Sequence, residues 1–356
     1  MEDLILRAFE TIFSSTNNNG FYDESFGIYP MLEYTVKDNS ITYLTSKRKY
    51  WRYNPFLMMG IMYTRLHIQN DEIKSHDGKI KKQLNILIEK LTNRDIKSLS
   101  SYTVGPLMVS FALAHEIYGD KKYIDAIDLI LNNTCFKIKI DEDAFLLLGL
   151  SYVYEHISKY REDTIEKIKV FTYEILKHQK DNALFVFRNI TSKRHQSQMY
   201  TLWALNRAFK ILNIENTEPI RKNIEYTIVK RMEEYGGIIW EDNVRFCSKI
   251  YHILKNTRYW TYYFECHQCF FAHTVFEYSR LFSDKRYNDR AKKALEWIFG
   301  NNRFNLDLLK LSGLNVPHRI VDVNGNAHVK GQKFKGAYEI GGYLMALTDY
   351  MLIDFF

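Results

Sequence analysis

Residues 103–131 read TVGPLMVSFALAHEIYGDKKYIDAIDLIL and hold two helical segments of opposite character. The first, up to Tyr118, is apolar on nearly every side, which predicts a buried helix. After the short turn at Gly119-Asp120, the segment Lys121–Leu131 has its apolar residues at spacings of three and four, with Lys122, Asp125 and Asp128 on the other face. This pattern predicts a helix with one buried side. The stretch is therefore a buried helix paired with a half-exposed one.

The same pairing occurs six times along the chain. The mostly apolar segments are Tyr53–Ile68, Thr103–Tyr118, Asp143–Ile157, Gln196–Leu212, Cys266–Phe282 and Gly336–Ile353. The amphipathic segments are Glu2–Phe13, Lys79–Leu91, Lys121–Leu131, Arg161–Lys177, Glu218–Glu233 and Tyr287–Phe299. Alternating buried and one-sided helices predict an inner ring surrounded by an outer ring. We expect an all-α (α/α)6 barrel, a toroid formed by residues 1–356 as a single domain.

The links between these segments differ greatly in length. Links from an inner to an outer segment are short, as at Ser283-Asp284-Lys285, whereas the outer-to-inner links 234–265 and 300–335 are long. Loops beyond about 12 to 15 residues in a compact domain are usually functional. The long links should meet at one rim, where the inner helices begin. Short β hairpins are expected in them, from strand-like stretches at 21–22, 183–187, 237–240 and 319–323.

Composition limits the partners and the compartment. A formal charge of +7 favours an anionic partner, but Lys and Arg are scattered, so nucleic acid is not expected. The cysteines, Cys135, Cys247, Cys266 and Cys269, form no disulfide framework for a chain this long. Glu2–Phe13 is unlike a secretory signal, and no uncharged apolar run reaches the roughly 18 residues of a membrane span. These features favour a soluble cytoplasmic protein with no membrane contact, provided that no leader has been removed.

Two further stretches carry a resemblance to a known superfamily. Trp297-Ile298-Phe299-Gly300-Asn301-Asn302 closes an outer helix, and Gly336-Ala337-Tyr338-Glu339-Ile340-Gly341-Gly342 opens the last inner one. With the helical pairs, which cover nearly the whole chain, they resemble the six-hairpin glycosidase-like superfamily of (α/α)6 toroids. The resemblance implies a carbohydrate site at the rim of long loops. Its members include glycoside hydrolases, polysaccharide lyases and sugar epimerases, and a shared fold does not identify the reaction.

Carboxylates at this rim are the candidate catalytic groups. Glycoside hydrolysis usually needs two, one protonated and one ionised. Glu241 and Asp242 lie in a long link beside Trp240, Glu265 directly precedes an inner helix, and Glu339 lies in the first turn of another. We predict that these four are catalytic. Asp141, Glu142 and Asp143 open a third inner segment, where helix capping is an equally good interpretation.

Aromatic and amide side chains near these carboxylates are the candidate substrate-binding groups. Aromatic rings offer faces on which sugars stack, and two inner helices each begin with a His-containing polar cluster. The predicted substrate-binding residues are His195, Gln198, Trp240, Tyr259, Trp260, Tyr263, His267, Gln268 and Tyr338. The competing interpretation is interior packing, with His267 as a hydrogen-bonded core residue.

Three functions of different classes remain open at this point. A glycoside hydrolase acting on an oligosaccharide, with a uronate-containing one as a candidate, predicts two rim carboxylates about 5 to 10 Å apart. A uronate lyase or sugar epimerase predicts Tyr or His, such as Tyr338, His195, His267 or His318, facing Arg or Lys. A noncatalytic carbohydrate-binding toroid predicts a centre that is plugged by side chains or that lacks converging titratable groups. The hydrolase is the favoured hypothesis.

Metal and cofactor chemistry is not expected. Cys266 and Cys269 lie three residues apart near His267 and His273, but a structural zinc site needs four ligands and the chain has no second cysteine pair nearby. Adjacent aspartates that bind diphosphates in terpene cyclases, the P-loop and the dinucleotide-binding glycine pattern are all missing from the sequence. We predict buried free thiols and no cofactor.

Overall fold

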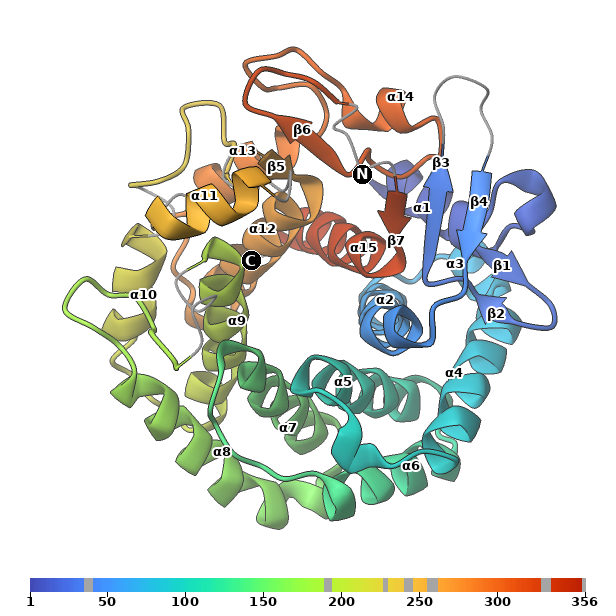
Figure 1. The fold of residues 1–356 in the computed structure, drawn as a ribbon. Coiled ribbons are helices and arrows are strands. Elements are labelled where there is room, and N and C mark those ends of the chain that lie inside the picture. The colour runs from blue at the N-terminus through green and yellow to red at the C-terminus, as the bar shows by residue number, and fades with distance from the viewer. Residues whose placement is uncertain are drawn as a thin grey trace.

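Two concentric rings of helices form the molecule (Figure 1). The computed structural model describes residues 1–34, 41–188, 194–226, 230–239, 246–254, 262–327 and 334–353. The inner helices are α2 (Lys47–His67), α5 (Ser101–Tyr118), α7 (Ala144–His156), α9 (His195–Ile211), α12 (Glu265–Phe282) and α15 (Ala337–Leu352). The outer helices are α1 (Glu2–Phe13), α4 (Asp77–Thr92), α6 (Lys121–Asn133), α8 (Arg161–Lys177), α10 (Glu218–Ile224) and α13 (Asn288–Glu296). The predicted (α/α)6 toroid is confirmed.

Each inner helix packs against the next along the chain, and α15 packs against α2 to close the ring. Closure takes place at a pair of glycines: a Cβ atom on Gly60 of α2 would lie 2.4 Å from the carbonyl oxygen of Gly341 on α15. The same device occurs between α5 and α7, where a Cβ atom on Gly149 would lie 3.0 Å from the Gly105 carbonyl oxygen. Backbones can approach this closely only where no side chain intervenes.

Most predicted helix bounds agree with the structure, and two do not. Helix α2 begins at Lys47, before the predicted Tyr53. The prediction missed its first turn because that turn is charged and exposed and has no apolar pattern. Helix α10 ends at Ile224, well before the predicted Glu233. From Lys230 the described chain turns, and the Glu233 amide bonds to the carbonyl oxygen of Gly237 at 3.0 Å. The shorter elements are α3 (Asp71–Ser75), α11 (Phe246–Leu254), α14 (Leu308–Ser312), η1 (Thr16–Asn18), η2 (Ile96–Ser98), η3 (Asp141–Asp143) and η4 (Ser158–Tyr160).

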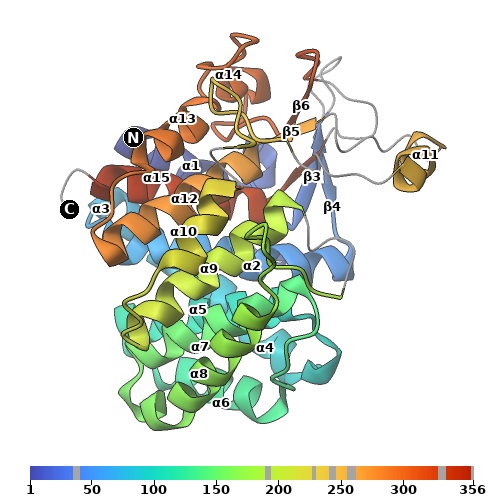
Figure 2. The same cartoon turned by 90° about the vertical axis from the view of Figure 1, so that its left-hand side faces the viewer.

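Short strands lie where inner helices begin. The strands are β1 (Tyr22–Asp23), β2 (Gly27–Ile28), β3 (Met31–Tyr34), β4 (Ile41–Leu44), β5 (Tyr262–Phe264), β6 (Ile320–Asp322) and β7 (Phe334–Gly336). β4 lies just before α2, and β5 and β7 directly precede α12 and α15. In the view turned by 90°, β3, β4, β6 and α11 lie on one side of the toroid, and α3, the N-terminus and the last turn of α15 lie on the other (Figure 2). We call the strand-bearing side the N-terminal rim and the opposite side the C-terminal rim.

Pairing at the N-terminal rim joins distant parts of the chain. The order β4-β3-β7 is antiparallel and aligns Met31 with Gly336, so the first and last thirds of the sequence share one sheet. β5 pairs with β6, which aligns Tyr263 with Val321. The strand-like stretches that we expected at 183–187 and 237–240 contribute only isolated bridges, Phe185 with Gln179 and Ile239 with Tyr263. Of the four expected stretches, 21–22 forms a local hairpin with β2, and 319–323 pairs with a separate link through β5.

An aromatic layer fills the middle of the inner ring. Phe56 of α2 contacts rings from α5, α7, α9, α12 and α15, with centroids 5.0 to 6.3 Å away. Each member of the layer is at most 8% exposed; they are Phe56, Tyr102, Phe145, Tyr200, Trp203, Phe270 and Tyr338. The layer separates the two rims. Within the described ranges, no helix combines the length and apolarity needed to cross a bilayer.

Candidate functional site

Two carboxylates and two cations meet at the N-terminal rim where α12 and α15 begin. Lys335 forms an ion pair with Glu265 and lies 3.8 Å from Glu339. Arg319 donates from Nε to Glu339 at 2.5 Å. We call these four residues the N-terminal ion cluster. Because both carboxylates approach one ammonium, they lie close together at the rim.

Backbone structure places each member of this cluster. Glu339 lies in the first turn of α15 and accepts the backbone N–H of Gly336 at 2.9 Å, so it also caps that helix. Strand β7 brings Lys335 beside it. Arg319 precedes β6, and its carbonyl oxygen accepts the backbone N–H of Glu265 at 3.1 Å. The carboxylates therefore come from helices and the cations from the links.

Burial sets the electrostatics of the cluster. Glu265 and Glu339 are both fully buried, and Lys335 is 1% exposed. Burial raises the pKa of Glu265 above its usual range; Lys335 opposes this effect and Glu339 adds to it. Such a carboxyl group can hold a proton near neutral pH. In this structure, however, neither carboxylate reaches solvent, so the cluster is covered.

Tyr338 and Arg319 form the outer edge of the cluster. Tyr338 and Arg319 lie close enough for each to influence the other's charge, and the two residues are 8% and 9% exposed. The Tyr338 ring lies 4.6 Å from the ring of Tyr53 on α2. Burial raises the pKa of Tyr338 well above its usual value, so its hydroxyl stays protonated at neutral pH. A ligand approaching from this side meets a phenol and a guanidinium first.

A second polar group stands across the ring, at the start of α7. Arg52 of α2 forms an ion pair with Glu142 at 3.0 Å, and the two side chains are 41% and 25% exposed. The Arg52 guanidinium lies 4.5 Å from the Tyr102 ring of the aromatic layer. Asp141, the residue before Glu142, accepts a hydrogen bond from Ser197 of α9. Carboxylates therefore lie at the starts of three inner helices, α7, α12 and α15, at the same rim.

Asp143 differs from these two neighbours. One of its oxygens accepts the backbone N–H groups of Lys139 and Ile140, and the other accepts the Ser101 hydroxyl. The capping interpretation therefore holds for Asp143. It does not account for Glu142, whose partner Arg52 belongs to another helix. Arg52 and Tyr53 were not predicted as site residues, because no carboxylate or histidine stands next to them in the sequence.

Gln198 and Gln268, which we predicted to bind substrate, hold link backbones instead. Gln198 bonds to both the N–H and the carbonyl of Phe185, at 2.9 and 2.8 Å. Gln268 does the same to Ile238, at 3.0 and 2.8 Å. Both amides are fully buried. Their hydrogen-bonding groups are occupied by the chain itself, which gives them a structural function.

The remaining described candidates divide between the ring interior and its edge. His195 and His267 begin neighbouring inner helices and are 0% and 2% exposed. Burial lowers the pKa of His267 to about 3, and the nearby His195 contributes to the shift. Tyr263 points outward: its hydroxyl donates to Glu233 and its ring lies 5.4 Å from Trp297 at the end of α13. The predicted residues Trp240, Glu241, Asp242, Tyr259 and Trp260 lie outside the described residues.

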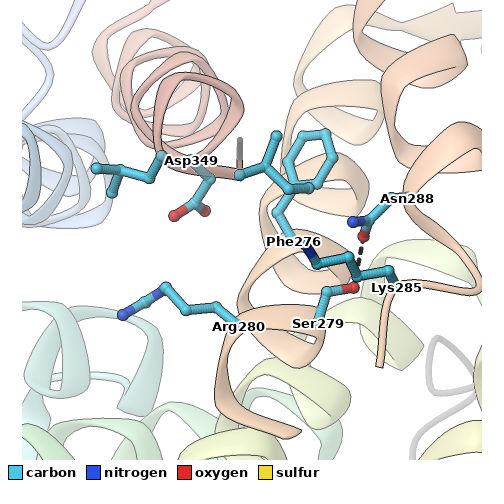
Figure 3. A pocket seen from close by; sticks show the side chains of 8 residues that line it. Phe276, Ser279, Arg280, Lys285, Asn288 and Asp349 are labelled. Carbon is cyan, nitrogen blue, oxygen red and sulfur yellow. Dashed lines mark hydrogen bonds between the residues drawn. The ribbon is translucent and has the colours of Figure 1, made fainter. Parts of the chain in front are cut away.

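A second buried ion cluster occupies the C-terminal rim, and the sequence analysis missed it. Asp349 of α15 accepts the Tyr63 hydroxyl at 2.5 Å and lies 2.5 Å from Nδ1 of His273. Arg207 of α9 pairs with Glu277 at 2.7 Å and Glu155 at 2.5 Å. The sequence does contain a signal for this cluster, because its charged residues interrupt segments that are otherwise apolar. The adjoining pocket between Asp349 and Arg280 (Figure 3) has about 10 Å³, barely enough for one water.

Metal-binding groups are not assembled in the described parts of the chain. No set of three or more His, Cys, Asp or Glu side chains there could hold a metal ion. Cys266 and Cys269 are buried free thiols, and burial raises the pKa of both well above the usual value. A thiol of this kind is protonated at neutral pH and is a poor ligand or nucleophile.

Comparison with known proteins gave similarity at the level of structure only. No family model and no curated protein matched the chain. An unsaturated glucuronyl hydrolase from Streptococcus agalactiae superposes with a TM-score of 0.61 at 13% identity, covering 98% of this chain and 90% of that one. A sugar epimerase from a ruminal bacterium gives 0.67 at 11% identity, covering 97% and 98%. A cellobiose 2-epimerase from Bacillus thermoamylovorans gives 0.66 at 9%, covering 98% and 100%. The resemblance to the six-hairpin glycosidase-like toroids is thereby confirmed for the fold.

Proposed function

We propose that this protein is a carbohydrate-active enzyme and, more narrowly, a glycoside hydrolase of an anionic oligosaccharide. The observation that carries the proposal is the convergence of carboxylates and guanidinium groups above the aromatic layer at the N-terminal rim. Glu142 pairs with Arg52 at the start of α7, and Tyr338 and Arg319 lie at the start of α15 on the same rim. A noncatalytic toroid predicts a filled centre or a rim without such groups; the aromatic layer meets the first condition, and the polar groups above it favour an enzyme. Here the filled centre forms the floor of a polar rim.

The two arginines support an acidic sugar as the substrate. A guanidinium binds a carboxylate through paired N–H groups, and a uronate carries such a group on its ring. Arg52 rests on the Tyr102 ring, which leaves its N–H edge available beyond the one bond to Glu142. Both arginines act on Tyr53: burial raises the pKa of Tyr53, and the charges of Arg319 and Arg52 oppose that effect. A uronate above Tyr53 would lie within reach of both cations.

The exposure of the carboxylates suggests their roles. Glu142 is partly exposed and is our choice for the carboxyl group that acts on the substrate. Glu265 and Glu339, which we predicted to be catalytic, are covered, and we assign them the role of positioning Lys335, Arg319 and Tyr338. The second carboxyl group that hydrolysis needs is still assigned to Glu241 or Asp242 on the sequence prediction alone.

An epimerase or lyase is the second candidate, because of one pair of residues. His195 and His267 lie close enough to interact electrostatically, and the lowered pKa of His267 keeps its imidazole neutral. A neutral imidazole near a guanidinium suits removal of a proton next to a carbonyl or carboxylate group. This alternative predicts that loss of either histidine abolishes activity and that loss of Glu142 does not.

A mass-resolved screen of uronate-containing and neutral oligosaccharides in ¹⁸O-labelled water separates the candidates. Hydrolysis puts the label into one product, elimination gives an unsaturated product without label, and epimerisation leaves the mass unchanged. On the substrate found, Glu142→Gln should lower kcat by about 10²-fold or more. Glu241→Gln and Asp242→Asn test the second carboxyl group.

Glu162→Gln, an exposed carboxylate on outer helix α8, is the matched control and should leave kcat unchanged. A folded Glu142→Gln protein with full activity would show that another group does the chemistry. If every oligosaccharide were left unchanged in mass and configuration, the enzyme proposal itself would fail.

A further inference from the structure

A pocket of about 370 Å³ lies at the outer edge of the N-terminal rim, between the beginning of α2 and the end of α4. Its volume falls within the range of about 300 to 1,000 Å³ typical of small-molecule sites. Lys47, Tyr50 and Trp51 line it from the first turns of α2, and Glu89, Lys90 and Arg94 from the end of α4. None of the roles assigned above uses this pocket.

Two of its cations rest on aromatic rings contributed by the other helix. The Arg94 guanidinium lies 5.4 Å from the Trp51 ring, and the Lys90 ammonium lies 5.2 Å from the Tyr50 ring. Tyr50 and Trp51 are only 4% and 7% exposed, so the rings are fixed platforms. A guanidinium stacked on a ring is held in place while its N–H edge remains free to bind an anion.

The cations have no carboxylate partner in the described parts of the chain. Lys47, Lys90 and Arg94 are exposed, and none of them forms an ion pair there. Glu89 is the single acidic residue of the lining, so the pocket has an excess of positive charge. Cations are favoured at a helix C-terminus, which accounts for Lys90 and Arg94 in general terms. The dipole does not explain Lys47, which belongs to the start of another helix, or the stacking on Tyr50 and Trp51.

We propose that this pocket is an auxiliary binding site for an acidic sugar unit, a uronate or a sulfated sugar, of the same oligosaccharide that reaches the rim. The choice of a sugar as the bound anion rests on the proposed function. The prediction that the pocket binds an anion rests on the arrangement of its cations alone. Trp51 directly precedes Arg52 and Tyr53 in the first turns of α2, so the pocket adjoins the residues assigned to the reacting sugar. A chain of acidic sugars could span both.

Calorimetric titration with hexagalacturonate, with maltohexaose as the neutral counterpart, tests the site directly. Wild-type protein should bind the acidic hexamer at least about 10-fold more tightly than the neutral one, and high salt should weaken the difference. The double variant Lys90→Ala/Arg94→Ala should lose about 10-fold in affinity for the acidic hexamer. Lys97→Ala, an exposed cation outside the pocket, should bind like the wild type.

Equal binding of the acidic hexamer by the double variant and the wild type would overturn the proposal, as would equal binding of the two hexamers. Trp51→Phe is a second variant for the case in which the double variant fails to fold; removing the larger platform should weaken binding of the acidic hexamer while leaving thermal stability near that of the wild type. If binding of the acidic hexamer depends on Arg94 but no oligosaccharide is turned over, the enzyme proposal is wrong and the binding-site proposal is supported. If turnover depends on Glu142 but binding of the acidic hexamer is unchanged by loss of Arg94, the enzyme proposal is supported and the binding-site proposal is wrong.

Discussion

Helices α12 and α15 carry a buried ion cluster at each end, and the two clusters are built differently. At the N-terminal rim the carboxylates Glu265 and Glu339 come from the helices, and the cations Lys335 and Arg319 come from long links. At the C-terminal rim all the charged members lie on inner helices, and the links there are short. The N-terminal ion cluster therefore joins long links to the inner helices, whereas the C-terminal cluster joins inner helices to one another.

This difference separates stability from function. A cluster made only of helix residues, beside a pocket of about 10 Å³, has room for nothing but its own partners. The N-terminal ion cluster fixes the links that carry Lys335 and Arg319, at the rim where Glu142 and Arg52 are partly exposed. We expect substitutions at the C-terminal rim to change the free energy of unfolding, and those at the N-terminal rim to change turnover.

Arg207→Met should have the largest effect on stability. The substitution leaves the fully buried Glu277 and the neighbouring Glu155 without their cation, and breaking a buried pair in this way costs about 3–5 kcal/mol. Urea unfolding measures the loss. Arg286→Met, which removes an exposed pair with Asp284, is the control and should change stability by less than about 1 kcal/mol. A loss below about 1 kcal/mol for Arg207→Met would contradict the structural role of the C-terminal rim.

One chemical change made at each rim sharpens the contrast. Tyr63→Phe removes the hydroxyl that Asp349 accepts at 2.5 Å and should cost about 1–3 kcal/mol of stability with turnover unchanged. Tyr338→Phe removes the hydroxyl at the edge of the N-terminal ion cluster and should lower kcat/KM by about 10-fold or more. Steady-state kinetics and unfolding curves of both variants decide the matter. The distinction between the rims fails if the two variants behave alike.

The smallest expected effect is on the pH dependence of stability. Burial lowers the pKa of His67, near Tyr63 at the C-terminal rim, to about 4. Between about pH 6.5 and pH 4 the unfolded chain binds a proton there that the folded chain does not, so this contribution to stability is present at pH 7 and is lost as the pH falls. His67→Gln should reduce the loss of stability between pH 7 and pH 5 by about 1–2 kcal/mol. Identical pH profiles for the variant and the wild type would refute the assignment.

Inner helices were predictable because the signal for burial is local. A segment such as Thr103–Tyr118, apolar all round, has only one stable environment, and α5 spans Ser101–Tyr118. The end of α10 was not predictable in this way, because the amphipathic pattern continues beyond Ile224 while the described chain after it turns.

The candidate site was only partly predictable, because partners from distant links decide what a polar residue does. Glu265 and Glu339 were recognised at helix starts, but their burial depends on β7 and β6, which bring Lys335 and Arg319 to them. Gln198 and Gln268 seemed alike in sequence because both begin inner helices. They are alike in structure for a different reason, since each binds the backbone of the link before it.

By itself the sequence determined the alternation of buried and one-sided helices, and with it the double ring, because hydrophobic periodicity depends on neighbouring residues alone. Tertiary structure decided which rim groups are exposed, which carboxylates are neutralised, and that strands from opposite ends of the chain share a sheet. Those outcomes depend on contacts between residues hundreds of positions apart, as between Met31 and Gly336, and no local pattern encodes such a contact.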